Sequence, residues 1–219
     1  TGRIQSAYKT VAHALSFAQP GDMINIAAGT YLETFPLTIP AGVSVRGEGL
    51  RATIIKPTTA TNTQTAMLLN GETLISDLTV AGFYKPGYAF KFAPSAKITS
   101  KSPYIERVSV ITQGSTVTPN DPYGYNAGDA GHGAYIDASV LDPTSLEPAL
   151  LFNEFTAIVP NANGIYLTNG ARAELLNGFT YFANTAITAQ YGTAGFGGQG
   201  KTKLRLSGVT GTFAAGDTI

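Results

Sequence analysis

One short pattern recurs along this chain at intervals of varying length. Each copy reads apolar, polar, polar or glycine, apolar, Ser or Thr, and usually apolar; the copies are Ile75–Val80, Ile105–Val110, Phe152–Ala157, Leu176–Tyr181 and Leu206–Thr210. If Leu78, Val108, Phe155, Phe179 and Val209 are equivalent, successive copies lie 30, 47, 24 and 30 residues apart. Because the steps vary while the pattern persists, we expect the insertions to lie in turns between strands.

A second apolar segment alternates with the first. It appears as Ala66–Leu69, Ala89–Phe92, Ala134–Asp137, Gly164–Leu167 and Ala186–Ala189. One segment of each kind makes a unit of about 20–30 residues, a period that indicates stacked repeats. An antiparallel meander gives no reason for loops of different length to recur at one corner, whereas a coil of parallel strands does. The sequence therefore predicts an all-β coil in which equivalent apolar side chains stack in one interior column.

The N-terminal part predicts one helix followed by strands. Residues 6–19 show helical spacing of apolar side chains, with Ser6 as N-cap and Pro20-Gly21 as the end; the expected buried face is Tyr8, Val11, Leu15 and Ala18. From Gln19 to Pro57, short apolar runs alternate with Pro and Gly turns, as is typical of strands. We expect the helix to cap the open end of the stack and to protect its edge.

The organisation predicted is a single β-helical domain over residues 1–219. Its longest insertion, residues 113–131, is polar and rich in Gly, Pro and Asn, so we expect a loop that leaves the stack. The segment Ala215–Ile219 repeats the Gly-Asp-to-strand pattern of Pro20–Ile24. We therefore expect the chain to be a fragment of a longer protein.

Composition narrows the function classes. Charged residues are 13% of the chain and the formal net charge is zero, which disfavours nucleic-acid binding because phosphate contacts need clustered Lys and Arg. Hydrophobic residues are 43%, enough for a large core. There are no cysteines, and no apolar run approaches the length of a membrane span. We expect neither a metal nor a cofactor.

Two resemblances to known families are visible. The segments Thr10–Leu15, Pro20–Ile24, Ala28–Tyr31, Leu37–Pro40 and Gly42–Gly47 closely resemble the start of pectin-lyase-like proteins. This resemblance implies a right-handed parallel β-helix, but it selects no activity, because lyases, hydrolases, adhesins and phage proteins share that fold. The segments Ser102–Val108, Gly164–Leu175 and Phe179–Tyr181 are similar to virion structural β-helix proteins of large tailed phages, marine ones in particular.

The best catalytic candidate is His132, within Gly131-His132-Gly133. This element is similar to the Gly-His-Gly of polygalacturonases, and its candidate partners are Asp129 and Asp137, with Asp121 also near in sequence. Glycoside hydrolysis needs two carboxyls roughly 5–10 Å apart. The other polygalacturonase elements, Asn-Thr-Asp and Asp-Asp, are absent. The alternative is that His132 and its glycines form the turn that returns the long loop to the stack.

A lyase site is a second enzymatic possibility. Asp77, Glu106 and Glu154 occupy neighbouring offsets of the repeat, so they can form a ladder on one outer face with Arg107 among them. Carboxylates so arranged suit Ca²⁺. The alternative is a solvated face with modest ion pairs.

Exposed aromatic side chains suggest a recognition surface. The candidates, expected in turns or loops, are Phe83, Tyr84, Tyr88, Tyr123 and Tyr125. Sugar rings stack on such side chains, and the Tyr hydroxyl adds a polar contact. The alternative is that these rings pack against a neighbouring subunit, because interfaces are enriched in Tyr and Phe.

The combined expectation is a structural phage virion protein, such as a tail fibre or spike, located in the virion. Its expected partners are other copies of itself, by analogy a homotrimer, other virion proteins and a host-surface polysaccharide. Two alternatives stay open: a polysaccharide lyase or glycoside hydrolase on the same scaffold, and a cellular adhesin that binds glycans without cutting them.

Overall fold

The protein is built from two parallel β-sheets with little helix. The computed structural model describes residues 7–59, 62–99, 101–112, 130–146, 148–190 and 203–206. The ten-stranded sheet A contains β1 (Met23–Ile26), β2 (Gly29–Glu33), β4 (Ser44–Gly47), β5 (Thr53–Pro57), β7 (Leu74–Ala81), β9 (Tyr104–Ile111), β11 (Ala149–Ile158), β13 (Arg172–Leu176), β14 (Phe179–Tyr181) and β16 (Lys203–Leu206). The six-stranded sheet B contains β3 (Leu37–Ile39), β6 (Met67–Leu69), β8 (Tyr88–Phe92), β10 (His132–Asp137), β12 (Asn163–Thr168) and β15 (Thr185–Ala189).

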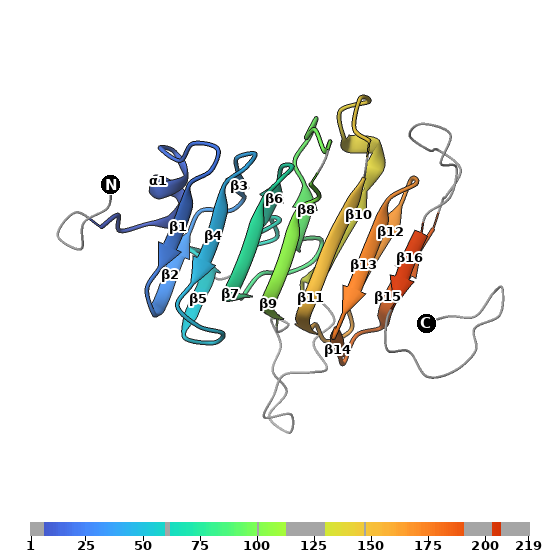
Figure 1. Cartoon of the computed structure of the whole chain (residues 1–219). Helices are drawn as coiled ribbons and strands as arrows, with labels where there is room; N and C mark the ends of the chain where they lie inside the picture. The colour runs from blue at the N-terminus through green and yellow to red at the C-terminus, as the bar shows by residue number, and fades with distance from the viewer. Residues whose placement is uncertain are drawn as a thin grey trace, which may run out of the picture.

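The chain passes alternately from one sheet to the other. In sheet A, β7, β9 and β11 are neighbours, whereas the strands that follow them in the sequence, β8, β10 and β12, are neighbours in sheet B. All pairings between the described strands are parallel. Figure 1 shows them in one row from the N-terminal end to the C-terminal end. The predicted all-β class and parallel pairing are confirmed, and an antiparallel meander is wrong.

Sheet A bends along a line that crosses its strands. Asp77, Arg107 and Glu154 lie at equivalent places inside β7, β9 and β11, with φ of 57°, 49° and 51°, and the register is the same on both sides of them. In other passes the bend separates two strands, β1 from β2, β4 from β5 and β13 from β14. Sheet A therefore has two outer faces. We call the one formed by β1, β4, β13 and the first halves of β7, β9 and β11 the first-half face.

The inward side chains form rows that continue from pass to pass. One row in sheet A is Ile24, Val45, Ile75, Ile105, Phe152 and Leu175. One row in sheet B is Leu37, Met67, Phe90, Ala134, Ile165 and Ile187. All of these side chains belong to one buried cluster or pack against it. Each buried aliphatic or aromatic side chain stabilises the fold by about 1.5–3 kcal/mol, so the rows hold the two sheets together.

The predicted equivalence of Phe179 is wrong. Leu78, Val108 and Phe155 are paired and buried as expected, but Phe179 pairs with Thr156 and is 55% exposed. Leu175, not Leu176, pairs with Phe152. Two adjacent leucines allow either register in the sequence pattern, and a slip of one residue turns every following side chain to the opposite face.

The N-terminal helix is much shorter than residues 6–19. Helix α1 spans Val11–Leu15, and its N-cap is Thr10, whose hydroxyl accepts a hydrogen bond from the His13 amide. Ser6, the expected N-cap, lies outside the described residues. Only Val11 and Leu15 are buried, whereas Tyr8 is 49% exposed. The buried Glu33 carboxylate of β2 also accepts hydrogen bonds from the amides of Val11 and Ala12, at 2.6 and 3.1 Å. This tertiary contact, and not periodicity alone, determines where the helix starts.

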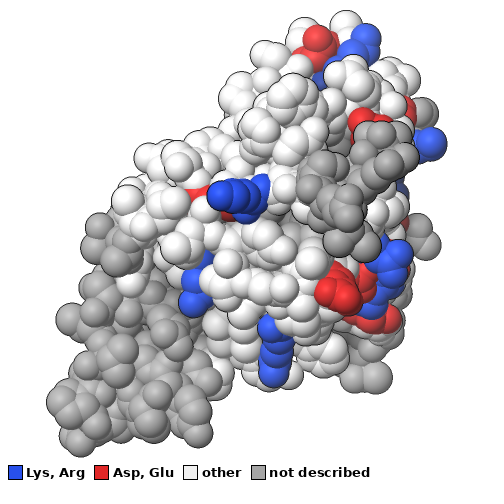
Figure 2. All heavy atoms as spheres, turned by 90° about the vertical axis from the view of Figure 1, so that its left-hand side faces the viewer, with Lys and Arg blue, Asp and Glu red and all other residues white. Residues whose placement is uncertain are grey.

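The surface at the N-terminal end of the molecule carries few charges. Figure 2, seen from the N-terminal end, shows mostly uncharged atoms, with Lys or Arg next to Asp or Glu in several places. Among the residues that the structure describes, no helix is long and apolar enough to cross a membrane. Most of the expected long loop, residues 113–129, lies outside the described ranges. Gly131, at its end, donates its amide to the Phe83 carbonyl at 3.1 Å.

Candidate functional site

His132 is the first residue of β10 and is held by structural contacts. Its Nδ1 accepts a hydrogen bond from the Asn163 amide at 2.9 Å, and its ring stacks on Tyr88 with centroids 4.5 Å apart. Burial lowers the pKa of His132 to about 4, and the charges of Lys85 and Lys91 act in the same direction. The imidazole is therefore neutral near pH 7, with one nitrogen already used as an acceptor.

Close packing explains why the residues on both sides of His132 are glycines. A Cβ at Gly131 would collide with the ring of Phe83, and one at Gly133 would collide with the carbonyl of Gly164 on the neighbouring strand. Only glycine permits such close approach of backbone and ring. The Gly-His-Gly element is thus accounted for by the packing of β10.

Asp137 lies at the opposite end of β10. Its carboxylate accepts hydrogen bonds from the Ser139 amide and hydroxyl at 2.8 and 2.6 Å, from Asn169 Nδ2 at 2.9 Å and from the Tyr135 hydroxyl at 3.2 Å. Burial acts to raise the pKa of Asp137, but the hydrogen bonds from Ser139, Asn169 and Tyr135 outweigh it and keep the pKa below its usual value. His132 and Asp137 are five positions apart on an extended strand, about 16 Å, so the structure does not bring them together. Asp129 and Asp121 lie outside the described residues.

The aromatic candidates are dispersed. Phe83 is fully buried and packs edge-on against Phe35, so the expectation that its side chain is exposed is wrong. Tyr84 is half-buried and forms an isolated bridge with Ala130. Tyr88 lies on sheet B in contact with His132. Tyr123 and Tyr125 lie outside the described residues.

Sheet B carries an aromatic ladder on its outer face. It was not predicted from the sequence, where exposed aromatic side chains are expected only in turns or loops. Lys91, Tyr135 and Tyr166 occupy one register position on β8, β10 and β12. The Lys91 ammonium lies 4.8 Å from the ring centroid of Tyr88 and 5.0 Å from that of Tyr135. Tyr135 and Tyr166 stack with centroids 5.3 Å apart. The sequence pattern did not align the three residues, because Lys91 and Tyr166 occupy the third position of the second recurring segment whereas Tyr135 occupies the second position of its copy.

The rings and the ammonium group of this ladder mainly contact one another. Burial lowers the pKa of Lys91, with Asp137 opposing the change, and burial with the nearby Asp137 carboxylate raises the pKa of Tyr135 to about 12. Tyr88 and Tyr135 stack on His132 and Tyr166 and also hold Lys91. Their ring faces are therefore largely used within the protein, which favours a role in stacking successive passes.

The first-half face of sheet A contains an open groove of about 540 Å³. Its lining residues, which define the sheet A groove, are Lys101, Ser102, Tyr104, Ala149, Leu151, Arg172 and Glu174. Tyr104, Leu151 and Glu174 form one row across β9, β11 and β13. Ala149 pairs with Arg172 and is almost fully covered by its neighbours, so it forms the floor of the groove.

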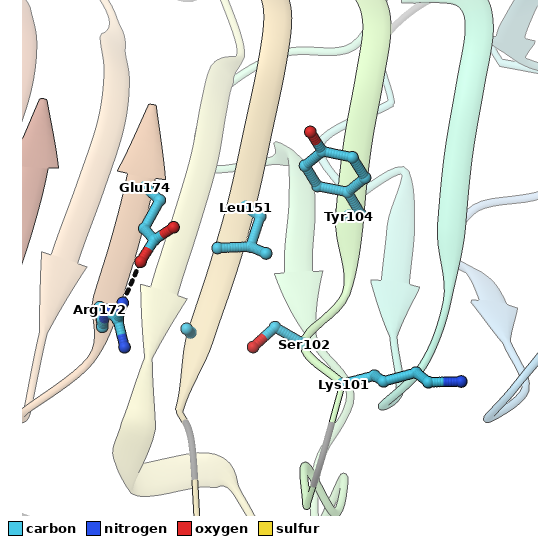
Figure 3. A pocket seen from close by; sticks show the side chains of 7 residues that line it. Lys101, Ser102, Tyr104, Leu151, Arg172 and Glu174 are labelled. Carbon is cyan, nitrogen blue, oxygen red and sulfur yellow. Dashed lines mark hydrogen bonds and ion pairs between the residues drawn. The ribbon is translucent and has the colours of Figure 1, made fainter. Parts of the chain in front are cut away.

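Figure 3 shows how these side chains lie. The Tyr104 ring is seen face-on beside Leu151, the Ser102 hydroxyl points toward the groove, and Arg172 and Glu174 form an ion pair at the opposite rim. The Lys101 side chain runs away from Arg172. Burial and the neighbouring Glu106 raise the pKa of Tyr104, whereas Arg107 and a hydrogen bond donated by Asn153 oppose the change. The phenol therefore stays protonated and can donate a hydrogen bond.

The acidic side chains near the bend are held by arginines. Arg107 contacts the two Asp77 oxygens at 2.6 and 3.1 Å and Glu106 at 2.5 Å, and Arg46 lies 3.3 Å from Asp77. The Arg107 hydrogen bond is the main cause that lowers the pKa of Asp77, against burial. Asp77, Arg107 and Glu154 occupy the same register position on β7, β9 and β11, whereas Glu106 lies one position earlier on β9. Within the described ranges, no group of three or more His, Cys, Asp or Glu side chains is arranged to hold a metal ion.

Comparison with known proteins gives one partial match. A family model described as a protein of unknown function (DUF1565) matches residues 1–81. That family consists of parallel-β-helix-like proteins, and the parallel strands described above fit it. No curated protein and no solved structure matches the chain with significance. The matched segment is similar to this family and covers the N-terminal helix and the strands as far as β7.

Proposed function

We propose that the chain is a right-handed parallel β-helix that serves as a rigid structural element of a larger assembly. The observation that carries the proposal is the continuous register: the same inward rows run through successive passes of both sheets. Side chains stacked in this way make each pass depend on its neighbours, which produces a stiff rod with little freedom to bend. Strand–crossover–parallel-strand connections are right-handed in about 98% of cases, which supports the proposed hand.

The proposed location is the virion of a tailed phage, as part of a tail fibre, spike or other appendage. Support comes from the resemblance of Ser102–Val108 and Gly164–Leu175 to virion β-helix proteins and from the outer faces, whose aromatic and charged side chains contact one another from pass to pass. In this proposal the chain associates with itself, as a homotrimer, and with other virion proteins.

Two measurements test this assignment. Immunogold electron microscopy of phage particles, with an antibody against this chain, should label an appendage. Analytical ultracentrifugation of the purified chain should give three times its mass of 22.8 kDa. Gold confined to host cells and absent from particles would favour the cellular adhesin instead, and a strictly monomeric chain would contradict the homotrimer.

The enzymatic alternative is less well supported by the site. The pKa of His132 is lowered, and one of its ring nitrogens accepts a hydrogen bond from the Asn163 amide. His132 does not lie near Asp137. A glycosidase needs two carboxyls within roughly 5–10 Å across the bond, and the described carboxylates Asp77, Glu106 and Glu174 are bound to arginines. Incubation with acidic polysaccharides should release no new chain ends. Release that disappears in His132→Ala or Asp129→Ala would overturn the structural proposal in favour of an enzyme.

A further inference from the structure

The sheet A groove is open to solvent, and its volume is comparable to that of a small-molecule site. Its volume of about 540 Å³ falls within the roughly 300–1,000 Å³ typical of ligand pockets. Tyr104, Leu151 and Glu174 come from three hydrogen-bonded neighbouring strands. A surface built on strands is more precise than one built on loops, so a ligand would meet these side chains already in place.

Tyr104 supplies a flat apolar platform within the groove. Figure 3 shows its ring face-on next to Leu151. On sheet B, by contrast, the ring of Tyr135 contacts Tyr166 and Lys91. A sugar ring has an apolar C–H face and a rim of hydroxyls, so it can stack on an available aromatic face and still form hydrogen bonds at its edge.

The polar groups around this platform match hydroxyl groups. The Ser102 hydroxyl lies on one side, and the paired Arg172 guanidinium and Glu174 carboxylate lie on the other. A guanidinium presents donors in a fixed plane and a carboxylate presents two acceptors, so together they can serve neighbouring hydroxyls of one sugar.

The charge balance of the groove selects against an acidic sugar. Acidic ligands are recognised by an excess of positive potential at the site. Of the three charged side chains that line the groove, Arg172 and Glu174 pair with each other and Lys101 is directed away from Arg172. The complementary ligand is therefore uncharged.

We infer that the sheet A groove binds an uncharged hexopyranose unit of a glycan, with the sugar ring on Tyr104 and its hydroxyls at Ser102, Arg172 and Glu174. This site is separate from Phe83–Tyr88 and from His132, where the sequence placed recognition and catalysis. The inference does not depend on the virion assignment, because it needs only the arrangement of β9, β11 and β13.

Saturation-transfer difference NMR with maltotriose, cellotriose, mannotriose and galactotriose tests the site, with trigalacturonate as the acidic arm. At least one uncharged trisaccharide should bind, and more tightly than trigalacturonate. Tyr104→Ala should weaken that binding about tenfold, because aromatic stacking is worth up to about 1.5 kcal/mol. Tyr104→Phe should keep most of it, and Ala149→Leu should abolish it, because the larger side chain would rise from the floor into the groove.

The matched control is Tyr166→Ala, which removes a ring from sheet B and should leave binding unchanged. Circular dichroism of each variant separates lost binding from lost folding. The inference is overturned if none of the four uncharged trisaccharides binds, if trigalacturonate binds more tightly, or if folded Tyr104→Ala and Ala149→Leu bind as the unmodified chain does.

Discussion

At the scale of single residues, burial and hydrogen bonding decide what the titratable groups can do. His132 is neutral because it is partly buried beside two lysines, and Asp137 is ionised because four hydrogen bonds outweigh its burial. Sequence proximity made them a plausible catalytic pair. The structure places them at opposite ends of one strand, each with its own hydrogen-bond partners.

The pKa of His132 predicts a loss of stability in mild acid. The unfolded chain binds a proton at this histidine below about pH 6.5, whereas the folded protein does so only near a pKa of about 4. Stability should therefore fall as the pH decreases from about 6.5 to about 4. In His132→Phe, which keeps a ring on Tyr88, urea midpoints should change less over this range.

Asp137→Asn provides the matched control for that experiment. The folded pKa of Asp137 is below its usual value, so its contribution is present above the unfolded pKa of about 3.9 and is lost only at lower pH. This variant should have a lower midpoint near neutral pH but the same slope between about pH 6.5 and pH 4.5. A His132→Phe curve parallel to that of the unmodified protein would contradict the assignment.

At the scale of elements, the bend of sheet A and the short helix show backbone geometry imposed by the whole fold. The bend places three charged residues, Asp77, Arg107 and Glu154, in a left-handed conformation. Nothing in their residue types requires it. The helix α1 has only five residues, too few to be stable alone, and depends on Glu33 and on its two buried side chains.

Glycine at the bend should be tolerated or favourable. Glu154 has φ of 51°, where glycine relieves about 1 kcal/mol of strain, so Glu154→Gly should be neutral or stabilising by up to about 1 kcal/mol. Asn153→Gly, one position earlier in regular strand, should destabilise by about 1 kcal/mol. Urea unfolding of the two variants checks this; equal losses in both would contradict the proposed strain.

Removing the charge of Glu33 should detach helix α1. Its carboxylate accepts both the Val11 and the Ala12 amides, and Glu33→Gln leaves one acceptor where two are needed. The free energy of unfolding should fall by about 1–2 kcal/mol, and hydrogen exchange should increase at the amides of Val11 and Ala12. Thr10→Ala, which removes the weaker cap, should have a smaller effect. Unchanged exchange at Val11 in Glu33→Gln would disprove the anchoring role.

At the scale of the whole molecule, successive passes share one interior, and the outer faces differ in character. Sheet B carries the aromatic ladder, and the first-half face carries the ion pairs and the groove. Because every inward row continues through neighbouring passes, removal of one buried ring should affect the entire stack.

A pair of phenylalanines tests this interior and its register. Phe155 is 1% exposed and Phe179 is 55% exposed. Phe155→Ala should therefore destabilise the protein by about 3–5 kcal/mol through cavity formation, whereas Phe179→Ala should cost less than about 1 kcal/mol. Chemical denaturation of both variants gives the comparison. Similar losses in the two variants would indicate that Phe179 is an interior residue after all.

The elements could be predicted from sequence to different extents. The recurring segments located the strands around Leu78 and Val108 because alternation of apolar residues reflects burial directly. The helix limits could not be predicted, because they depend on Glu33, a residue 22 positions away from Val11. The sheet A groove could not be predicted either, since Tyr104, Leu151 and Arg172 meet only when three passes lie side by side.

The sequence by itself determined the all-β class, the parallel pairing and most of the interior, because buried positions of a strand appear in the sequence as regularly recurring apolar residues. Tertiary structure alone decided the register of Leu175, the bend in sheet A and the hydrogen-bond and ion-pair partners of each polar side chain. These depend on which residues of different passes become neighbours, and that contact has no local signature in the chain.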